Sequence, residues 1–280
     1  MMQKSRYSKP WQNAKMTIPD TGQNQYQNKI VAFLDILGFR QKVSQNTSIA
    51  TETIKQIDEA ISHTVGIIKS EGPTSISIKL FSDCFCISCD PFELDLLVRE
   101  LSYLQLFLST KNIFVKGAIS QGRHFESENI IFSEGLVKAY EFQIKDRFPR
   151  IKIDEVIVER MKEDAPSEYL IVAPDGVCFL DYLQALTWEG VDALMDDLFK
   201  EHKKAIVEEV KRNKGDYKVI EKYKWLAEYH NTKFYLLYDL DDYYEEYQKE
   251  MLNEMFISSD IFPSFKIGAL NFSKINLNNV

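Results

Sequence analysis

The sequence predicts an α+β fold in which a ferredoxin-like core is followed by a helical extension. Short apolar or alternating segments typical of strands lie at residues 29–36, 75–89 and 113–120, and the middle segment is typical of a hairpin. Apolar residues recur at helical intervals in the stretches between them, over residues 38–70 and 92–109. The resulting order of strand, helix, hairpin, helix and strand is β-α-β-β-α-β, which is the ferredoxin-like layout.

The first predicted strand carries a carboxylate close to its end. The run KIVAFLDI is too short to span a membrane and rich enough in Ile, Val and Phe for a buried strand, which Asp35 interrupts. A carboxylate in such a place is costly unless a cation or hydrogen-bond donors meet it. Gly38 follows where the strand could turn sharply into a helix, whose free N–H groups could bind phosphate. Taken alone, Asp35 fits a satisfied buried residue as well as a functional one.

The predicted hairpin carries a second carboxylate. The segments SISIKLF and CFCIS both alternate apolar with polar or small residues, and Ser82 and Asp83 fall at the tip between them. An aspartate at a hairpin tip is usually a turn former, because its side chain bonds the local backbone. Two aspartates at neighbouring strand ends, however, supply hard oxygen ligands suited to Mg²⁺ or Mn²⁺. The pair Asp35 and Asp83 therefore predicts a metal site.

The pattern of the chain divides it into four parts. Residues 1–27 are polar and predict a loose tail, residues 28–175 the core domain, residues 176–240 a helical extension, and residues 241–280 an acidic, weakly ordered end. The core domain also contains a predicted helix at 131–146 and an extended segment at 148–155. In the extension, helices are predicted over 190–212 and 217–230. His202 and the aromatic residues of this extension are expected to pack in a core or a dimer interface.

Composition excludes several kinds of function. Hydrophobic residues make up 45% of the chain, which predicts a folded globular protein, and 34 basic against 42 acidic residues give a net charge of −8. This charge argues against wide-area binding to nucleic acid or to an anionic membrane. No apolar run approaches the length of a membrane span and the start is not a secretory signal, so we expect a cytoplasmic protein. Cys84, Cys86 and Cys89 have no further ligand at zinc-like spacing and are expected to be reduced strand residues.

Three short motifs resemble those of the class III nucleotidyl cyclases, whose catalytic domain is a ferredoxin-like palm. The first is a strand ending Phe-x-Asp-Ile-x-Gly-Phe, matched by Phe33, Asp35, Ile36, Gly38 and Phe39. The second is Lys-x-x-Gly-Asp at a hairpin, matched by Lys79 and Asp83 with Ser82 in place of the glycine. The third, a strand leading into Gly-Ile-x-x-Gly, is approached by VKGAISQG, with Ile119 and Gly122 in register. The resemblance covers roughly residues 28–160.

The resemblance implies a nucleotide cyclase that uses two divalent ions, Mn²⁺ or Mg²⁺. Asp35 and Asp83 would coordinate both ions, with the backbone carbonyl of Ile36 as a further ligand. In this family the ribose 3′-hydroxyl, acidified beside one ion, attacks the α-phosphate, while the other ion balances the charge of the leaving pyrophosphate. The product is a 3′,5′-cyclic nucleotide. The remaining matched residues would bind the nucleotide: Phe33, Gly38, Phe39 and Lys79.

Three further positions depart from the family's pattern. The family's Asn and Arg on the helix after the third motif fall on Val137 and Glu141, and its purine-reading position falls on Ile130. None of these side chains can do the corresponding work. This combination is similar to the pyrimidine cyclases of the Pycsar anti-phage defence systems, which keep both metal aspartates and diverge at purine recognition. The similarity implies UTP, or next CTP, as substrate, and cyclic UMP or cyclic CMP as a messenger that activates a separate effector without direct binding.

The resemblance leaves several points open. The group that replaces the transition-state arginine is sought among four arginines near the motifs, each of which also fits an ordinary solvated residue: Arg40, Arg123, Arg147 and Arg150. The family further implies a homodimer with composite sites, because one palm supplies the metal ligands and the other supplies base and transition-state contacts. A non-catalytic palm that senses a nucleotide or binds a partner protein is one alternative, favoured by Val137 and Glu141. A purine (adenylate or guanylate) cyclase is the other.

Overall fold

Nine strands join in one sheet within the part of the chain that the computed structural model describes, residues 26–44, 47–70, 72–164, 167–188, 191–238, 245–262 and 273–274. The strands are β1 Gln27–Ile36, β2 Ser77–Phe81, β3 Cys84–Cys89, β4 Val115–Glu126, β5 Ile131–Ser133, β6 Ile151–Ile153, β7 Leu170–Val172, β8 Cys178–Leu180 and β9 Ser273–Lys274. The α-helices are α1 Phe39–Ser44, α2 Thr47–Ser70, α3 Leu94–Thr110, α4 Glu134–Ile144, α5 Glu155–Asp164, α6 Met195–Arg212, α7 Tyr217–Leu237 and α8 Glu245–Met255.

The order of the strands confirms the predicted fold class. From one edge the sheet runs β2-β3-β1-β4, and each neighbouring pair in this part is antiparallel. Numbered in chain order, these strands stand in the order 4-1-3-2, which is the ferredoxin-like arrangement. The sheet then continues through β6, which is parallel to β4, and through β8, β7 and β9.

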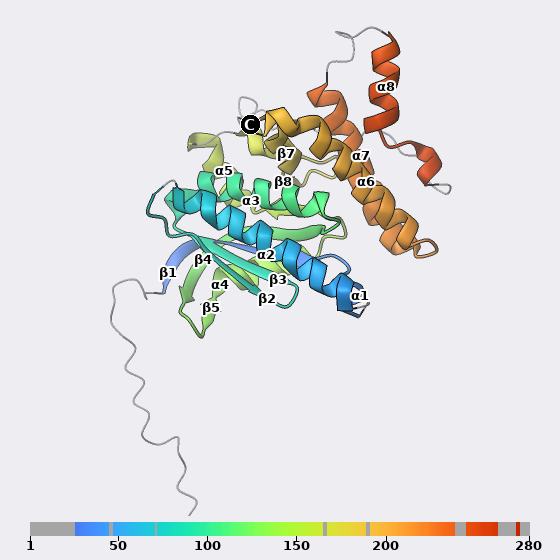
Figure 1. The fold of residues 1–280 in the computed structure, drawn as a ribbon. Helices are drawn as coiled ribbons and strands as arrows, with labels where there is room; N and C mark the ends of the chain where they lie inside the picture. The colour runs from blue at the N-terminus through green and yellow to red at the C-terminus, as the bar shows by residue number, and fades with distance from the viewer. Residues whose placement is uncertain are drawn as a thin grey trace, which may run out of the picture.

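Strand β1 lies at the centre of the core. Its even-numbered apolar side chains join one large cluster with α2 and α3, whereas Phe33 points to the other face and packs with Ala118 and Ala139. In α2 the buried side chains recur every three or four positions, as in an amphipathic helix: Ile57, Ala60, Thr64 and Ile68. Helices α2 and α3 therefore lie along one face of the sheet, and α4 lies against the other (Figure 1).

Two glycines allow α4 to approach β4 at backbone distance. A Cβ atom on Gly122 would lie 2.7 Å from the backbone nitrogen of Gly135, which is closer than real Cβ contacts. The hydroxyl of Ser120 donates to the carbonyl oxygen of Gly135 over 2.6 Å. The side chain of Ser133 caps α4 by accepting from the Leu136 N–H. The glycine of the third motif thus has a packing role in this chain.

Short strands account for most differences from the sequence predictions. The helix predicted over 131–146 begins only at Glu134, because residues 131–133 form β5 and pair with the far end of β4. Strand β8 lies where the sequence predicts only a helical extension, and it pairs with β6 and β7. Strands of three residues are too short to show a period of two. The sheet therefore crosses the predicted boundary between residues 175 and 176.

The ends of the chain differ in how much can be compared with prediction. Of the predicted N-terminal tail, residues 1–25 lie outside the described residues. The end predicted to be weakly ordered contains α8, whose Met251 and Met255 are buried in the core that α6 and α7 form. The predicted extended segment contains β6 and is followed by α5, a helix that the sequence reading missed.

The histidines of α6 and α7 are packed in this second core, as predicted for His202. Both His202 and His230 are fully buried, and their Nδ1 atoms lie 2.9 Å apart. The hydroxyl of Tyr182 lies 2.7 Å from Nε2 of His202, and Nε2 of His230 donates to the carbonyl oxygen of Met255. The polar atoms of the pair are therefore matched inside an aromatic core.

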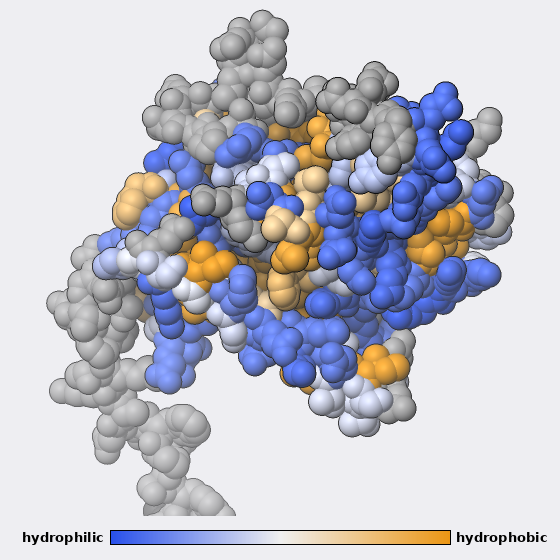
Figure 2. Space-filling view, turned by 45° about the horizontal axis from the view of Figure 1, so that its top comes forward, coloured by the Kyte–Doolittle hydropathy of each residue, from blue (hydrophilic) through white to orange (hydrophobic). Residues whose placement is uncertain are grey.

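No helix in the described part of the chain combines the length and the apolar composition needed to cross a bilayer. On the face drawn in Figure 2, hydrophobic residues lie among hydrophilic ones.

Replacing Gly122 by Ala should destabilise the protein, because the new methyl group meets the backbone of α4. We expect a loss of about 1–3 kcal/mol in the free energy of unfolding, measured by urea denaturation. The matched control is Gly66→Ala, since a Cβ at this exposed position of α2 meets nothing within 4 Å. The control should gain up to about 1 kcal/mol from helix propensity. Equal stabilities of the two variants would contradict the close approach of α4.

The buried histidine pair should make stability fall with acid. Burial lowers the pKa of His202 well below its ordinary value and that of His230 to about 3, so both rings are neutral in the folded protein. Below about pH 6.5 the unfolded chain takes up protons that the folded chain does not. Stability should therefore be full above this pH, and each histidine should cost about 1.4 kcal/mol at pH 5.5.

Urea denaturation at pH 7.5 and pH 5.5 measures this loss. The variant His230→Asn should lose less than the wild type between the two pH values, whereas His63→Asn, at an exposed position of α2, should behave as the wild type. An identical loss in His230→Asn and the wild type would assign the effect to other groups.

Candidate metal centre

A row of three polar side chains crosses the sheet at the end of β1. In the antiparallel pairings, Asp35 lies opposite Cys84 of β3 on one side and opposite Lys116 of β4 on the other. Directly opposed residues of neighbouring strands point to the same face of a sheet. The three side chains therefore lie on the face of the sheet that α4 covers further along β1. Their row itself lies beyond the edge of α4.

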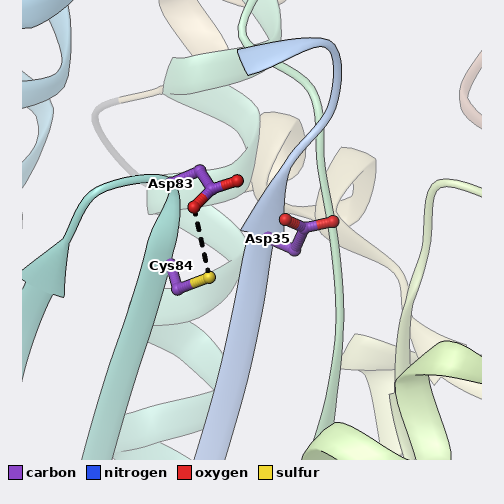
Figure 3. Close-up of side chains that lie close together, drawn as sticks. All are labelled: Asp35, Asp83 and Cys84. Atoms are coloured by element: carbon purple, nitrogen blue, oxygen red, sulfur yellow. Dashed lines mark hydrogen bonds between the residues drawn. The ribbon is translucent and has the colours of Figure 1, made fainter. Parts of the chain in front are cut away.

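Asp83 joins this row from the tip of the β2–β3 hairpin. Ser82 before it adopts a left-handed backbone conformation with φ of 58°, and the carbonyl oxygen of Asp83 accepts from the Ile36 N–H over 2.9 Å. This hydrogen bond ties the hairpin tip to the last residue of β1. As a result, ligand atoms of Asp35, Asp83 and Cys84 all lie within 4.8 Å of one another (Figure 3).

The electrostatics of the row favour a bound cation. Partial burial raises the pKa of Asp35, the neighbouring Lys116 opposes this shift, and the carboxylate of Asp83 adds to it. The ammonium of Lys116 lies 3.8 Å from Oδ2 of Asp35, so it compensates only one of the two carboxylates closely. A divalent ion between two neighbouring, partly buried carboxylates would stabilise their charged forms.

The donor set fits a hard ion better than a soft one. Burial, followed by the two aspartates, raises the pKa of Cys84 to about 12, so its thiol is protonated and donates to Oδ1 of Asp83. The ligands that remain are carboxylate oxygens, which suit Mg²⁺ or Mn²⁺. The predicted further ligand, the carbonyl oxygen of Ile36, belongs to the residue whose N–H is already bound to Asp83. Its role as a ligand stays a prediction.

The other residues of the first motif serve the fold. Phe33 is 6% exposed and packs edge-on against Tyr140 of α4, which leaves its side chain no open surface for a nucleotide. Phe39 packs against the main core. Gly38 has φ of +68°, a conformation that glycine adopts without strain, and its carbonyl oxygen accepts from the first turn of α1. The motif is thus largely a way to end β1 and turn the chain.

Lys79 lies one row away from Asp35 on the same face. Lys79 pairs with Cys86, which in turn pairs with Phe33, so all three occupy the next row along the sheet. Its ammonium lies 3.7 Å from the carboxylate of Glu126, at the end of β4. Glu126 also accepts hydrogen bonds from Ser77 and Ser88. A donor and an acceptor therefore stand side by side where the resemblance predicts a nucleotide-binding lysine.

The four candidate arginines differ sharply in their surroundings. Arg150 is 3% exposed, and its guanidinium is held by Asp146 and by a bidentate pair with Asp175, so it is a structural residue and not a free phosphate ligand. Arg123 pairs with Glu134 and lies seven positions along β4 from Lys116.

The two remaining arginines are exposed. Arg40 is exposed on α1, shortly after Asp35 in the chain. Arg147 is exposed, its guanidinium lies 4.8 Å from the centre of the Phe148 ring, and it lines a cavity together with Lys222 of α7.

The three positions that lack the family's purine-reading, Asn and Arg residues are all exposed: Ile130, Val137 and Glu141.

The sequence reading missed three charged residues: Lys116 and Lys222 close to the metal centre, and Glu126 beside Lys79. Lys116 could have been found, because it stands three positions before Ile119 of the third motif on the same predicted strand. Glu126 gives a weaker signal, since β4 runs six residues beyond its predicted end. No sequence signal points to Lys222, because α7 reaches the site only through tertiary packing.

Comparisons with known proteins find solved structures that match the chain at low sequence identity. No protein-family model and no curated protein matches the chain. Two structures of a bacterial light-regulated adenylyl cyclase match at 12% identity over 64% of this chain and 58% of theirs, with TM-scores of 0.42 and 0.41. A class III adenylyl cyclase-like ATP-binding protein from Pseudomonas aeruginosa matches at 14% identity over 57% of this chain and 39% of its own, with a TM-score of 0.37. The chain spans less than two thirds of the length of these structures, and similarity at this level does not establish a function.

Proposed function

We propose that this protein is a metal-dependent nucleotide cyclase that converts a nucleoside triphosphate into a 3′,5′-cyclic nucleotide and pyrophosphate. The observation that carries the proposal is the approach of Asp35 and Asp83, at neighbouring strand ends of a ferredoxin-like sheet, within 4.8 Å between ligand atoms. A binding-only domain has no need for two hard-metal ligands held together at some electrostatic cost. The cost is visible in the raised pKa of Asp35, which burial causes and Asp83 increases.

The charged residues at the candidate metal centre would have separate roles. Divalent ions held here would supply the positive charge that acidifies the ribose 3′-hydroxyl and balances the leaving pyrophosphate. Asp35 and Asp83 would hold them, and Lys116 fixes the carboxylate of Asp35 from the neighbouring strand. The hydrogen bond from Ile36 to Asp83 keeps the two ligands in register. Positioning and electrostatics are what phosphoryl-transfer chemistry asks of a protein.

We favour a pyrimidine substrate, UTP before CTP. The exposed Ile130 has no side-chain group that could read a purine, and Val137 and Glu141 cannot provide the usual contacts to the substrate and transition state. The ammonium of Lys79 could instead donate a hydrogen bond to the edge of a pyrimidine base, and the carboxylate of Glu126 could accept one from it. The cyclic product would act as a messenger for a separate effector in anti-phage defence.

We also propose that the protein forms a homodimer with composite sites. Exposed apolar side chains gather on β5, on α4 and in the turn before them, where a second copy could cover them: Ile130, Phe132, Val137, Tyr140 and Ile144. Lys79 of one copy would then read the base of the nucleotide held by the aspartates of the other.

Mn²⁺ should stabilise the wild-type protein through Asp35 and Asp83. At a concentration one hundred times its dissociation constant, an ion adds about 2.7 kcal/mol, which raises the melting temperature by roughly 5–10 °C in a chain of this size. The shift should disappear with EDTA and in Asp35→Asn, and it should persist in Asp58→Asn, an exposed position of α2. Equal shifts in Asp35→Asn and the wild type would place the ion elsewhere.

Turnover tests the reaction itself. The purified protein is incubated with each of the four ribonucleoside triphosphates and Mn²⁺ or Mg²⁺, and products are identified by mass spectrometry. We expect cyclic UMP or cyclic CMP, and a loss of at least about 100-fold in rate in both Asp35→Asn and Asp83→Asn, but not in Asp58→Asn.

Other outcomes of this experiment select the alternatives. Cyclic AMP or cyclic GMP as the main product would replace the pyrimidine assignment by a purine cyclase. Nucleotide binding without turnover of any triphosphate, in the presence of both metals, would indicate a nucleotide sensor.

A further inference from the structure

Helix α7 is held against the strand ends that carry the candidate metal centre. The ring of Tyr223 on α7 meets the ring of Phe114 edge-on, with centroids 5.6 Å apart. Phe114 lies just before β4, and its carbonyl oxygen accepts from the N–H of Leu37, just after β1, over 2.8 Å. All three side chains belong to one buried cluster. The C-terminal helices therefore pack on the corner of the sheet where β1 ends, next to Asp35, and β4 begins, next to Lys116.

This contact places Lys222, the residue before Tyr223, beside that corner. Lys222 is partly buried, and its ammonium makes no hydrogen bond or ion pair with any of the described residues. Burial lowers the pKa of Lys222, Lys116 lowers it further, and Asp35 opposes both, so all three groups lie within electrostatic range. The two lysines repel each other beside the carboxylate pair, and Lys116 has an ion-pair partner in Asp35 whereas Lys222 has none among the described residues.

Lys222 also lines a cavity. It has a volume of about 320 Å³ and is lined by Arg147 and Phe148 from the loop before β6 and by Lys218, Glu221 and Lys222 from α7. Three of these five residues are cations and one is an acid. A neighbouring cavity of about 300 Å³ shares Arg147, Phe148 and Glu221 and extends along α7 to Trp225. The first cavity therefore has a positively charged lining, which suits an anionic ligand, whereas the neighbouring one is lined by Asp175, Glu221 and Glu228 as well as by Arg147 and Lys224.

We infer that Lys222, together with Lys116, binds the β- and γ-phosphates of the nucleotide whose α-phosphate lies at Asp35 and Asp83. This inference rests on the proposed function. Ammonium groups donate charge-assisted hydrogen bonds to phosphate oxygens, and a partly buried ammonium does so with little competition from water. The helical extension would then supply within the same chain the positive charge that α4 lacks at Val137 and Glu141. Arg147 is the candidate arginine that faces the same cavity.

The test compares Lys222→Gln with two matched variants. Lys222→Arg keeps the charge, and Lys211→Gln removes one charge from an exposed position at the end of α6. Melting temperatures should be similar in all three, because none of these side chains supports a buried contact. In the cyclase assay, Lys222→Gln should raise the KM for the triphosphate about tenfold, Lys222→Arg should stay within about threefold of wild type, and Lys211→Gln should leave KM unchanged.

A binding measurement separates this inference from the proposed function. Calorimetric titration with inorganic tripolyphosphate and Mn²⁺ needs no turnover, and Lys222→Gln should weaken it about tenfold relative to the wild type and to Lys211→Gln. Weakened binding in a protein that makes no cyclic nucleotide would support the phosphate site and reject the cyclase. An active enzyme in which Lys222→Gln changes neither KM nor tripolyphosphate affinity would keep the cyclase and overturn the role of Lys222.

Discussion

Two backbone hydrogen bonds at the end of β1 hold the hairpin tip and the start of β4 against this strand. The N–H of Ile36 donates to Asp83, and the next N–H, that of Leu37, donates to Phe114. The first bond brings the hairpin tip, with its carboxylate, to the carboxylate of Asp35. The second bond fixes the start of β4 and with it the aromatic contact that seats α7. Consecutive peptide groups thus join three distant parts of the chain at one corner of the sheet.

The same corner explains why polar groups are tolerated at the end of a buried strand. Along most of β1 both faces are closed, one by α2 and α3 and the other by α4, and the strand is accordingly apolar. At Asp35 the cover of α4 has ended and the side chain is only partly buried. The cost of its charge is reduced by Lys116 but not removed. This residual cost is the physical basis for expecting a cation there.

Sequence reasoning found the parts of the fold that depend on local pattern. The strands β1 to β4, the helices between them and the packed state of His202 follow from periodicity, and the two aspartates follow from motifs of a few residues. The strands β5, β7 and β8 were missed because three residues carry no period. The burial of Phe33 and the ion pairs of Arg150 depend on partners far along the chain, so their motif positions alone suggested a nucleotide role that their surroundings do not support. Lys222 could not be found at all, because its position is set by a contact between Tyr223 and Phe114.

The pairing of β9 with β7 has a consequence for how the chain is made. Residues 273 and 274, near the far end of the described chain, complete the sheet edge opposite β2 by pairing with Ile171 and Val172. During synthesis from the N-terminus, β7 therefore leaves the ribosome long before its neighbour exists, and its outer backbone groups stay unpaired in the meantime. Folding of this edge waits on translation of residues 273 and 274, so a polypeptide interrupted before them would expose a strand edge open to association with other chains.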